Sequence, residues 1–194
     1  MPPTRIVIAE DEAIIRLDLK ETLEEEGYEV VGETGRGDEA VDLVKEHEPD
    51  IAILDIKMPG LDGLSAAREI AGERRAAVLI LTAFSQRDLI EKARDAGALA
   101  YLVKPFQRSE LIPAVEVALG RFQEMRALES EVKGLEDQLE TRKVVDRAKG
   151  ILMDKHGMTE ADSFAFIQKT AMNERRSMKS VAEEVVAGQL TPPQ

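Results

Sequence analysis

Five short apolar segments recur along the first hundred residues, and they constrain the fold more than any other feature of the chain. We expect β-strands at 6–9, 29–32, 51–54, 78–81 and 100–103. Amphipathic stretches that predict helices lie between them, near 12–26, 37–47, 62–72 and 86–96. This alternation predicts an α/β fold with a doubly wound, five-stranded parallel sheet, whose functional residues lie at the carboxyl ends of the strands.

After Pro105 the pattern changes to one long helix, followed by a small all-α domain of three helical segments. Three such short helices need one another to bury apolar surface. An apolar stripe with alternating three- and four-residue steps precedes them, at Met125, Leu128, Val132, Leu135 and Leu139. This spacing is typical of a short coiled coil, although packing of the stripe against its own domain explains it equally well. The predicted parts are 1–120, a helical linker or short coiled coil at 121–140, and a three-helix domain at 128–190.

Local signals place the last two helices. Thr159 and Asp162 predict a helix start, and this helix is expected to present Phe164, Ile167 and Ala171 on one face. The final helix is expected to begin near Ser177.

Composition limits the classes of function. No apolar run is long enough to span a bilayer and there is no cysteine, so we expect a cytoplasmic protein without a membrane partner. The formal charge of −12 argues against a protein that coats nucleic acid over its whole surface. The segment from Thr141 to Val181 nevertheless carries nine Lys/Arg against five Asp/Glu. It is therefore a candidate polyanion site, and a solvated helix surface is the alternative.

Three carboxylates follow the predicted strands. Glu10 and Asp11 come directly after the first strand, and Asp55 follows the third. Because the ends of neighbouring parallel strands converge, we expect these side chains to repel one another until a hard cation such as Mg²⁺ binds. Thr82 and Lys104 follow the fourth and fifth strands, where a hydroxyl and an ammonium could hold phosphoryl oxygens.

These positions resemble the signature of the receiver domain, a flavodoxin-like module of two-component systems. The matching runs are Glu10-Asp11, the stretch 54–63, Leu81-Thr82-Ala83 and Lys104-Pro105-Phe106. The resemblance implies that a sensor histidine kinase phosphorylates Asp55. It also implies that Glu10, Asp11, Asp55 and the backbone carbonyl of Lys57 hold Mg²⁺. Family members often carry Asp where this chain has Glu10.

Other roles follow from the same resemblance. Thr82 and Lys104 would bind the phosphoryl group, and Tyr101 occupies the position of the family's switch aromatic. Lys57 and Phe84 occupy positions that tune hydrolysis of the phosphoryl group. A cis bond between Lys104 and Pro105 would aim the ammonium inward.

The C-terminal part resembles the ANTAR domain, and the whole chain resembles actinobacterial receiver–ANTAR regulators. The match rests on the run 144–153, on Phe164, on Ala171-Met172, and on Val181-Ala182 with Val185-Val186. Ser163 and Thr170 stand where the family often has Ala. It implies binding of paired stem-loops in transcripts, which allows transcription antitermination. The candidate RNA contacts are Arg142, Arg147, Lys149, Lys155, Arg175 and Arg176. We interpret Ala148 and Gly150 as small residues that let helices pack closely.

Two other classes of function stay open. The chain could be a phosphorylation-gated DNA-binding transcription factor, although no recognition helix follows a short glycine turn. It could also be a protein-interaction scaffold that binds no nucleic acid. A metabolic enzyme is not expected, since no nucleophile–base pair is evident outside the carboxylate pocket. Phosphorylation is expected to promote a homodimer through the 125–139 stripe.

Overall fold

The computed structural model describes residues 2–83 and 87–192, and the chain separates into two compact units, Met1–Arg126 and Ala127–Gln194. One helix, α5 (Arg108–His156), continues from the first unit into the second. We describe each unit by itself.

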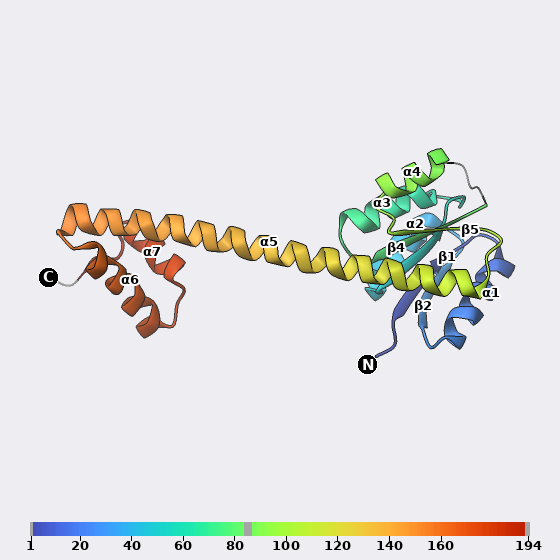
Figure 1. The fold of residues 1–194 in the computed structure, drawn as a ribbon, viewed down its shortest axis with the longest axis horizontal. Helices are drawn as coiled ribbons and strands as arrows, with labels where there is room; N and C mark the ends of the chain where they lie inside the picture. Colours follow the sequence, from blue (N-terminus) through green and yellow to red (C-terminus); the bar gives the residue numbers. More distant parts are fainter. Residues whose placement is uncertain (1, 84–86, 193–194) are drawn as a thin grey trace. The chain divides into compact units, whose positions relative to one another are not determined.

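The first unit contains the predicted five-stranded parallel sheet (Figure 1). Its strands are β1 (Arg5–Ala9), β2 (Glu29–Thr34), β3 (Ile51–Asp55), β4 (Ala77–Thr82) and β5 (Ala100–Val103). They are ordered β2-β1-β3-β4-β5. The interiors of the three central strands are fully buried, which explains why these segments are apolar throughout. The α/β fold class is confirmed.

Helices cover both faces of this sheet. The first unit adds α1 (Ala13–Glu25), α2 (Gly37–His47), α3 (Gly63–Gly72) and α4 (Arg87–Asp95). Along β1, Val7 and Ala9 pack with α2, α3 and α4, whereas Ile6 and Ile8 pack with α1 and the start of α5. This alternation follows from the two-residue period of a strand, which directs successive side chains to opposite faces of the sheet. The start of α5 therefore packs against the same face of the sheet as α1. Leu111 of α5 is fully buried there.

The second unit is a three-helix arrangement of the end of α5 with α6 (Glu160–Glu174) and α7 (Met178–Val186). Its core joins one apolar stripe from each helix: Val145, Ala148 and Leu152; Ile167 and Ala171; Val181, Ala182 and Val185. The side chains of Thr159 and Ser177 accept hydrogen bonds from the third backbone N–H beyond them, so both predicted helix starts are confirmed.

Two details of this core differ from the sequence interpretation. Phe164 does not share the buried face of Ile167, because its side chain is 41% exposed while the neighbouring Ser163 is fully buried. Within the described residues, no atom outside its own stretch of helix lies within 4 Å of where a Cβ on Gly150 would be. The interpretation of Gly150 as a close helix–helix contact is therefore wrong, whereas Ala148 is packed as expected.

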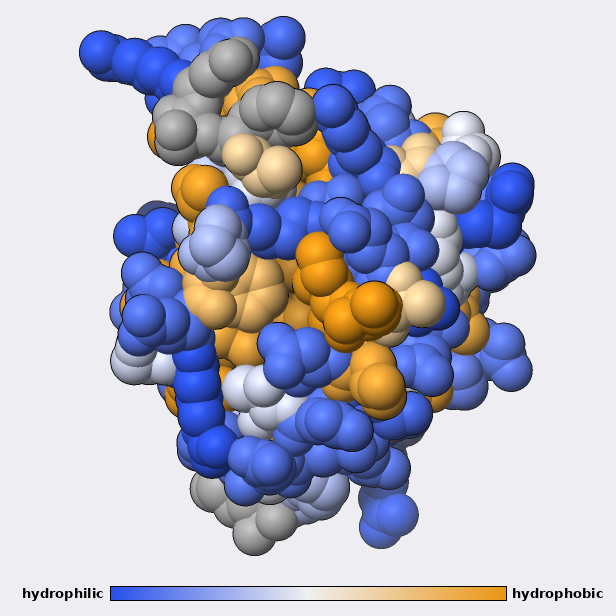
Figure 2. All heavy atoms as spheres, turned by 90° about the vertical axis from the view of Figure 1, so that its right-hand side faces the viewer, coloured by the Kyte–Doolittle hydropathy of each residue, from blue (hydrophilic) through white to orange (hydrophobic). Residues whose placement is uncertain are grey.

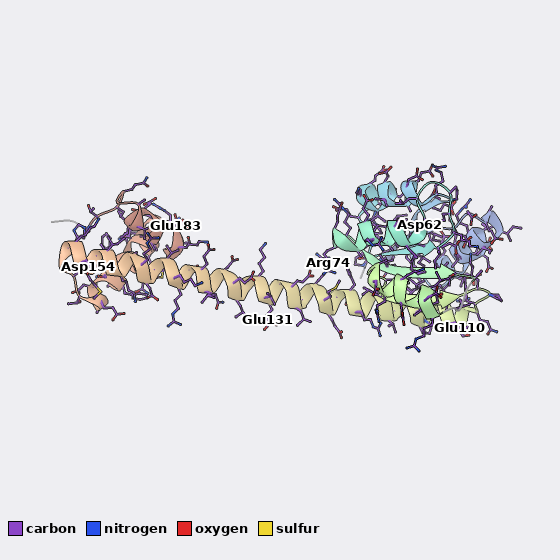
Figure 3. The ribbon with its side chains drawn as sticks, turned by 90° about the horizontal axis from the view of Figure 1, so that it is seen from above. Asp62, Arg74, Glu110, Glu131, Asp154 and Glu183 are labelled. Atoms are coloured by element: carbon purple, nitrogen blue, oxygen red, sulfur yellow. The ribbon has the colours of Figure 1, made fainter. Side chains whose placement is uncertain are left out.

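The side chains of the apolar stripe at 125–139 differ in how far they are exposed to solvent. Met125 packs against the first unit. The remaining members are more than half exposed: Leu128, Val132, Leu135 and Leu139. Glu131 also projects from this stretch of α5 (Figure 3). Of the two explanations of the stripe, packing against a domain of the same chain therefore holds for Met125, but it does not explain the four exposed residues.

The surface of the first unit is mainly hydrophilic. Figure 2 shows one of its faces, where charged and polar residues surround a small group of hydrophobic ones. Helix α1 contributes two exposed apolar side chains, Ile14 at 85% and Leu17 at 55% exposure. In the part of the chain that is described, no helix has the length and apolarity needed to cross a membrane.

Candidate functional site

The carboxyl ends of β1 and β3 bring three acidic side chains together. Glu10, Asp11 and Asp55 each offer a carboxylate oxygen, and these oxygens lie within 4.8 Å of one another. Glu10 is fully buried and Asp55 is 4% exposed, whereas Asp11 lies open to solvent. The adjacent pairing of the two strands places the three groups at one edge of the sheet. The three carboxylates thus lie close together in the structure, as the strand positions predicted.

Lys104 lies between the two buried carboxylates. Its Nζ is 2.8 Å from Oε2 of Glu10 and 3.0 Å from Oδ1 of Asp55, and its side chain is only 11% exposed. The bond between Lys104 and Pro105 is cis. The backbone N–H of Lys104 donates to the carbonyl of Thr82 at 2.7 Å, which joins the ends of β4 and β5.

Burial and charge set the protonation of this cluster. Burial raises the pKa of Glu10, and the hydrogen bond from Lys104 opposes that rise without cancelling it. Burial alone would lower the pKa of Lys104, but hydrogen bonds to Glu10 and Asp55 outweigh it and leave this pKa raised. Lys104 therefore stays charged, and the buried carboxylates favour positive charge beside them.

Thr82 and Tyr101 form the next layer of the site. Thr82 ends β4 and is 1% exposed, while Tyr101 is half-buried on β5. Burial raises the pKa of the Tyr101 hydroxyl, and a hydrogen bond with Thr82 acts in the opposite direction. The two residues that the sequence assigned to phosphoryl binding and switching are therefore in contact.

The loop after β3 holds Asp55 through the backbone. The N–H of Lys57 donates to Oδ2 of Asp55 at 3.1 Å, while the side chain of Lys57 is exposed. Beyond it, Asp62 caps α3 by accepting from the N–H of Ser65 at 2.9 Å. Phe84 lies outside the described residues.

Sequence reasoning missed two residues that shape this edge of the sheet. A Cβ on Gly63 would lie 1.8 Å from the carbonyl oxygen of Asp55, so only glycine allows α3 to begin so close to β3. The guanidinium of Arg16, on α1, donates to the carbonyl of Glu10 and fixes the end of β1. Gly63 could have been found as the last residue of the 54–63 run, but no local signal marks Arg16.

The donor set suits a hard divalent cation. Three carboxylates supply oxygen ligands, one of them exposed and two buried, and such ligands match the preference of Mg²⁺. Thiolate ligands are absent because the chain has no cysteine. The residues present therefore fit the predicted cation.

The candidate RNA contacts of the second unit divide into two groups. Lys149 binds Asp146 at 2.8 Å and Glu160 at 2.9 Å, and Arg176 bridges Glu174 and Glu184. Arg142 is 83% exposed and makes only a loose pair with Asp146, at 4.0 Å. Among the described residues no ion pair involves the other three, which are Arg147, Lys155 and Arg175.

Comparison with known proteins accounts for both units. Residues 6–116 match the family model of the response regulator receiver domain, and residues 133–186 match that of the ANTAR domain. The transcriptional regulatory protein PdtaR of Mycobacterium tuberculosis is 61% identical over 190 residues, which are 98% of this chain and 93% of that protein. The chain is a two-component response regulator of the receiver–ANTAR type.

The first unit of this regulator also resembles single-domain receivers. The chemotaxis protein CheY of Bacillus subtilis is 38% identical over 59% of the chain and 97% of its own length. A crystal structure of a CheY-like receiver domain protein from Methanospirillum hungatei matches 63% of the regulator and 98% of that chain, with 25% identity and a TM-score of 0.59. The resemblance inferred from the sequence motifs is confirmed.

The close contact at Gly63 predicts a local sensitivity in the receiver unit. Gly63→Ala should lower the free energy of unfolding by about 1–3 kcal/mol, because the new methyl group overlaps the Asp55 carbonyl. Gly72→Ala is the matched control, since a Cβ there meets no atom within 4 Å. Urea unfolding followed by tyrosine fluorescence reports on this unit alone, because the chain has no tryptophan and its two tyrosines are Tyr28 and Tyr101. Equal midpoints for the two variants would contradict the prediction.

Proposed function

We propose that this response regulator is phosphorylated on Asp55 by a sensor histidine kinase and then acts on transcription by binding RNA. The observation that carries the first half is the position of the Lys104 ammonium between Asp55 and Glu10 at hydrogen-bond distance. A carboxylate nucleophile needs its approaching anionic substrate to be neutralised, and this site concentrates the groups that can do so.

In the proposed step, an oxygen of Asp55 attacks the phosphorus of a phosphohistidine. The bond between phosphorus and the histidine nitrogen breaks, the electron pair leaves with the imidazole, and an acyl phosphate forms on Asp55. Lys104 and the hydroxyl of Thr82 would then bind the oxygens of the transferred group. Bound Mg²⁺, held by Glu10, Asp11, Asp55 and the carbonyl of Lys57, would neutralise charge on the phosphoryl group.

The contact between Thr82 and Tyr101 supports a route for the signal. When Thr82 turns toward the phosphoryl group, its hydrogen bond to the Tyr101 hydroxyl is lost, and the ring is free to turn inward. The kinase would approach the same edge of the sheet, because α1 begins just after Asp11 and exposes Ile14 and Leu17 there. Two exposed apolar side chains beside a reactive carboxylate suit a transient protein interface.

Replacing the proposed nucleophile should abolish phosphorylation. Asp55→Asn keeps the size of the side chain but removes the anionic oxygen, so incubation with acetyl phosphate and Mg²⁺ should yield no mass increase. Glu12→Gln is the control, because Glu12 lies beside the cluster with an exposed side chain and should accept phosphate as the wild type does. Equal phosphoryl incorporation in the Asn variant and the wild type would reject Asp55 as the site.

We infer that the second unit binds stem-loops in transcripts and thereby permits antitermination. Support comes from the ANTAR match over 133–186 and from three cations without carboxylate partners among the described residues, Arg147, Lys155 and Arg175. Arg binds phosphates and stacks on unpaired bases, which suits RNA loops better than a regular duplex. A protein of net charge −12 needs such a local site, since its overall field repels nucleic acid.

Salt dependence distinguishes this function from its alternatives. The phosphorylated protein should bind a two-hairpin RNA more tightly than duplex DNA, with an affinity that falls steeply as salt rises. Arg147→Gln should reduce the slope of log affinity against log salt by about 0.7–0.9, the share of one phosphate contact. Lys45→Gln, in the receiver unit, should leave the slope unchanged. Tighter binding of duplex DNA would favour a DNA-binding transcription factor, and no binding of either would favour a scaffold.

We propose further that phosphorylation promotes a homodimer through the exposed stripe at 128–139, which would place two ANTAR units on paired loops. Leu135→Asp should abolish the doubling of mass in sedimentation equilibrium with Mg²⁺ and beryllofluoride, because it puts a charge into the seam. Ser130→Asp, off the stripe, should dimerise normally. A monomeric wild type in the presence of both beryllofluoride and RNA would refute the dimer.

A further inference from the structure

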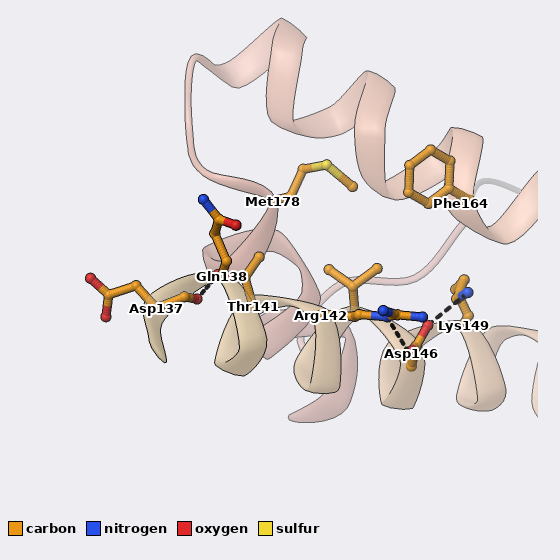
Figure 4. Close-up of a pocket in the computed structure, with 9 residues that line it drawn as sticks. Asp137, Gln138, Thr141, Arg142, Asp146, Lys149, Phe164 and Met178 are labelled. Carbon is orange, nitrogen blue, oxygen red and sulfur yellow. Dashed lines mark hydrogen bonds and ion pairs between the residues drawn. The ribbon is translucent and has the colours of Figure 1, made fainter. Parts of the chain in front are cut away.

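A cavity of about 540 Å³ opens in the second unit, between α5 and the walls formed by α6 and α7 (Figure 4). Its apolar lining comes from Phe164 on α6, Met178 on α7 and Val145 on α5. Its polar lining includes Arg142 and Asp146, which follow the same side of α5. Phe164 and Met178 therefore lie across this space from the charged groups of α5, and the space is large enough for a small planar ligand.

Phe164 is the unusual member of this wall. Ile167, on the same helix, is fully buried, and Phe166 packs partly buried against the core, but 41% of Phe164 stays exposed. Aromatics make up only 4% of the chain, and an exposed ring contributes little to the core of this unit. An aromatic ring beside cations and hydrogen-bond acceptors is the arrangement on which unpaired bases stack.

Asp146 is held in a fixed orientation with one oxygen nearly free. Lys149 binds its Oδ1 at 2.8 Å and also reaches Oε1 of Glu160 on α6 at 2.9 Å, so this lysine ties α5 to α6. The hydrogen bond from Lys149 also lowers the pKa of Asp146, which keeps the acceptor ionised. The other oxygen, Oδ2, makes one loose ion pair among the described residues, with the guanidinium of Arg142 at 4.0 Å.

Arg142 completes the arrangement. Its side chain is 83% exposed, so it can turn from Asp146 to a phosphate at little energetic cost. That movement would leave Oδ2 of Asp146 open to a new donor. These three groups match the three parts of a nucleotide. The ring of Phe164 suits the flat base, the ionised Asp146 suits a donor on the edge of the base, and the mobile Arg142 suits the phosphate.

We propose that this cavity binds one unpaired base of an RNA loop, which stacks on Phe164 and donates from its exocyclic amino group to Asp146, while Arg142 holds an adjoining phosphate. This assignment rests on the proposed RNA-binding function and gives it a specific site. Adenine, guanine and cytosine carry an exocyclic amino group, whereas uracil does not. Uracil offers only its ring N3–H, flanked on both sides by carbonyl oxygens that a carboxylate repels, so we expect the cavity to favour an amino-bearing base over uracil at one loop position.

The probe is a stem-loop RNA enriched by the full-length protein from a pool of hairpins with randomised loops. Phe164→Leu keeps an apolar side chain but removes the stacking ring, and it should weaken binding about five- to a hundred-fold. Phe164→Tyr keeps the ring and should bind within about two-fold of wild type. Phe166→Leu is the matched control, because the same change on the same helix lies outside the cavity lining.

A coupled measurement separates stacking from a loss of fold. Each loop base is replaced in turn by an abasic site, and affinities are measured for the wild type and for Phe164→Leu. At one position the abasic loss in the wild type should match the loss caused by Phe164→Leu, and the two losses should not add. At that position Asp146→Ala should lose the preference for an amino-bearing base over uracil.

The outcomes distinguish this site from the function on which it rests. If the wild type enriches no RNA from the pool, the proposed RNA binding fails and the cavity assignment fails with it. If the wild type binds RNA but Phe164→Leu binds equally and couples to no loop position, the cavity assignment alone is overturned. Coupling at one position together with the loss of uracil discrimination supports it.

Discussion

The ion bridge from Lys104 to Glu10 and Asp55 is the constraint on which the receiver unit depends. Two buried carboxylates at the ends of adjacent strands would repel each other, and the ammonium from a third strand compensates them. The bridge thereby couples the ends of β1, β3 and β5, so a change in the charge of any one group alters the balance for the others. A phosphoryl group on Asp55 would compete with Glu10 for the hydrogen bonds of the Lys104 ammonium. The contacts that stabilise the site would therefore also change on phosphorylation.

Sequence reasoning could find this site because parallel strands convert sequence position into spatial position. Glu10, Asp55, Thr82 and Lys104 each directly follow or end an apolar run, and the sheet order places those runs side by side. Contacts between backbone and backbone were harder to foresee. The approach of Gly63 to the Asp55 carbonyl depends on the angle at which α3 leaves the loop, and no local residue preference encodes that angle.

The second unit was predicted less completely, for a geometric reason. One residue along a helix turns the side chain by about 100°, so a small error in helix rotation exchanges a buried position for an exposed one. For this reason Ser163, which lies next to the expected stripe, is buried, whereas Phe164, which was expected to belong to the stripe, is 41% exposed. The open surface at Gly150 has the same origin: the core stripe of Val145, Ala148 and Leu152 turns that glycine away from the other helices.

Charge in the second unit also depends on three-dimensional pairing. A count of basic residues treats Lys149, Arg176 and Arg147 as equal. In the described part of the chain, however, carboxylates of the same unit bind the first two, and no ion pair involves the third. Paired cations orient the helices and the acceptor Asp146, whereas unpaired cations remain available for phosphates. In the proposed RNA binding by this acidic chain, the division would limit the electrostatic part of the affinity to a few contacts. Under that proposal, discrimination between loops would come from the shape and the hydrogen-bonding edge of a base, and an aromatic ring opposite a carboxylate can recognise both.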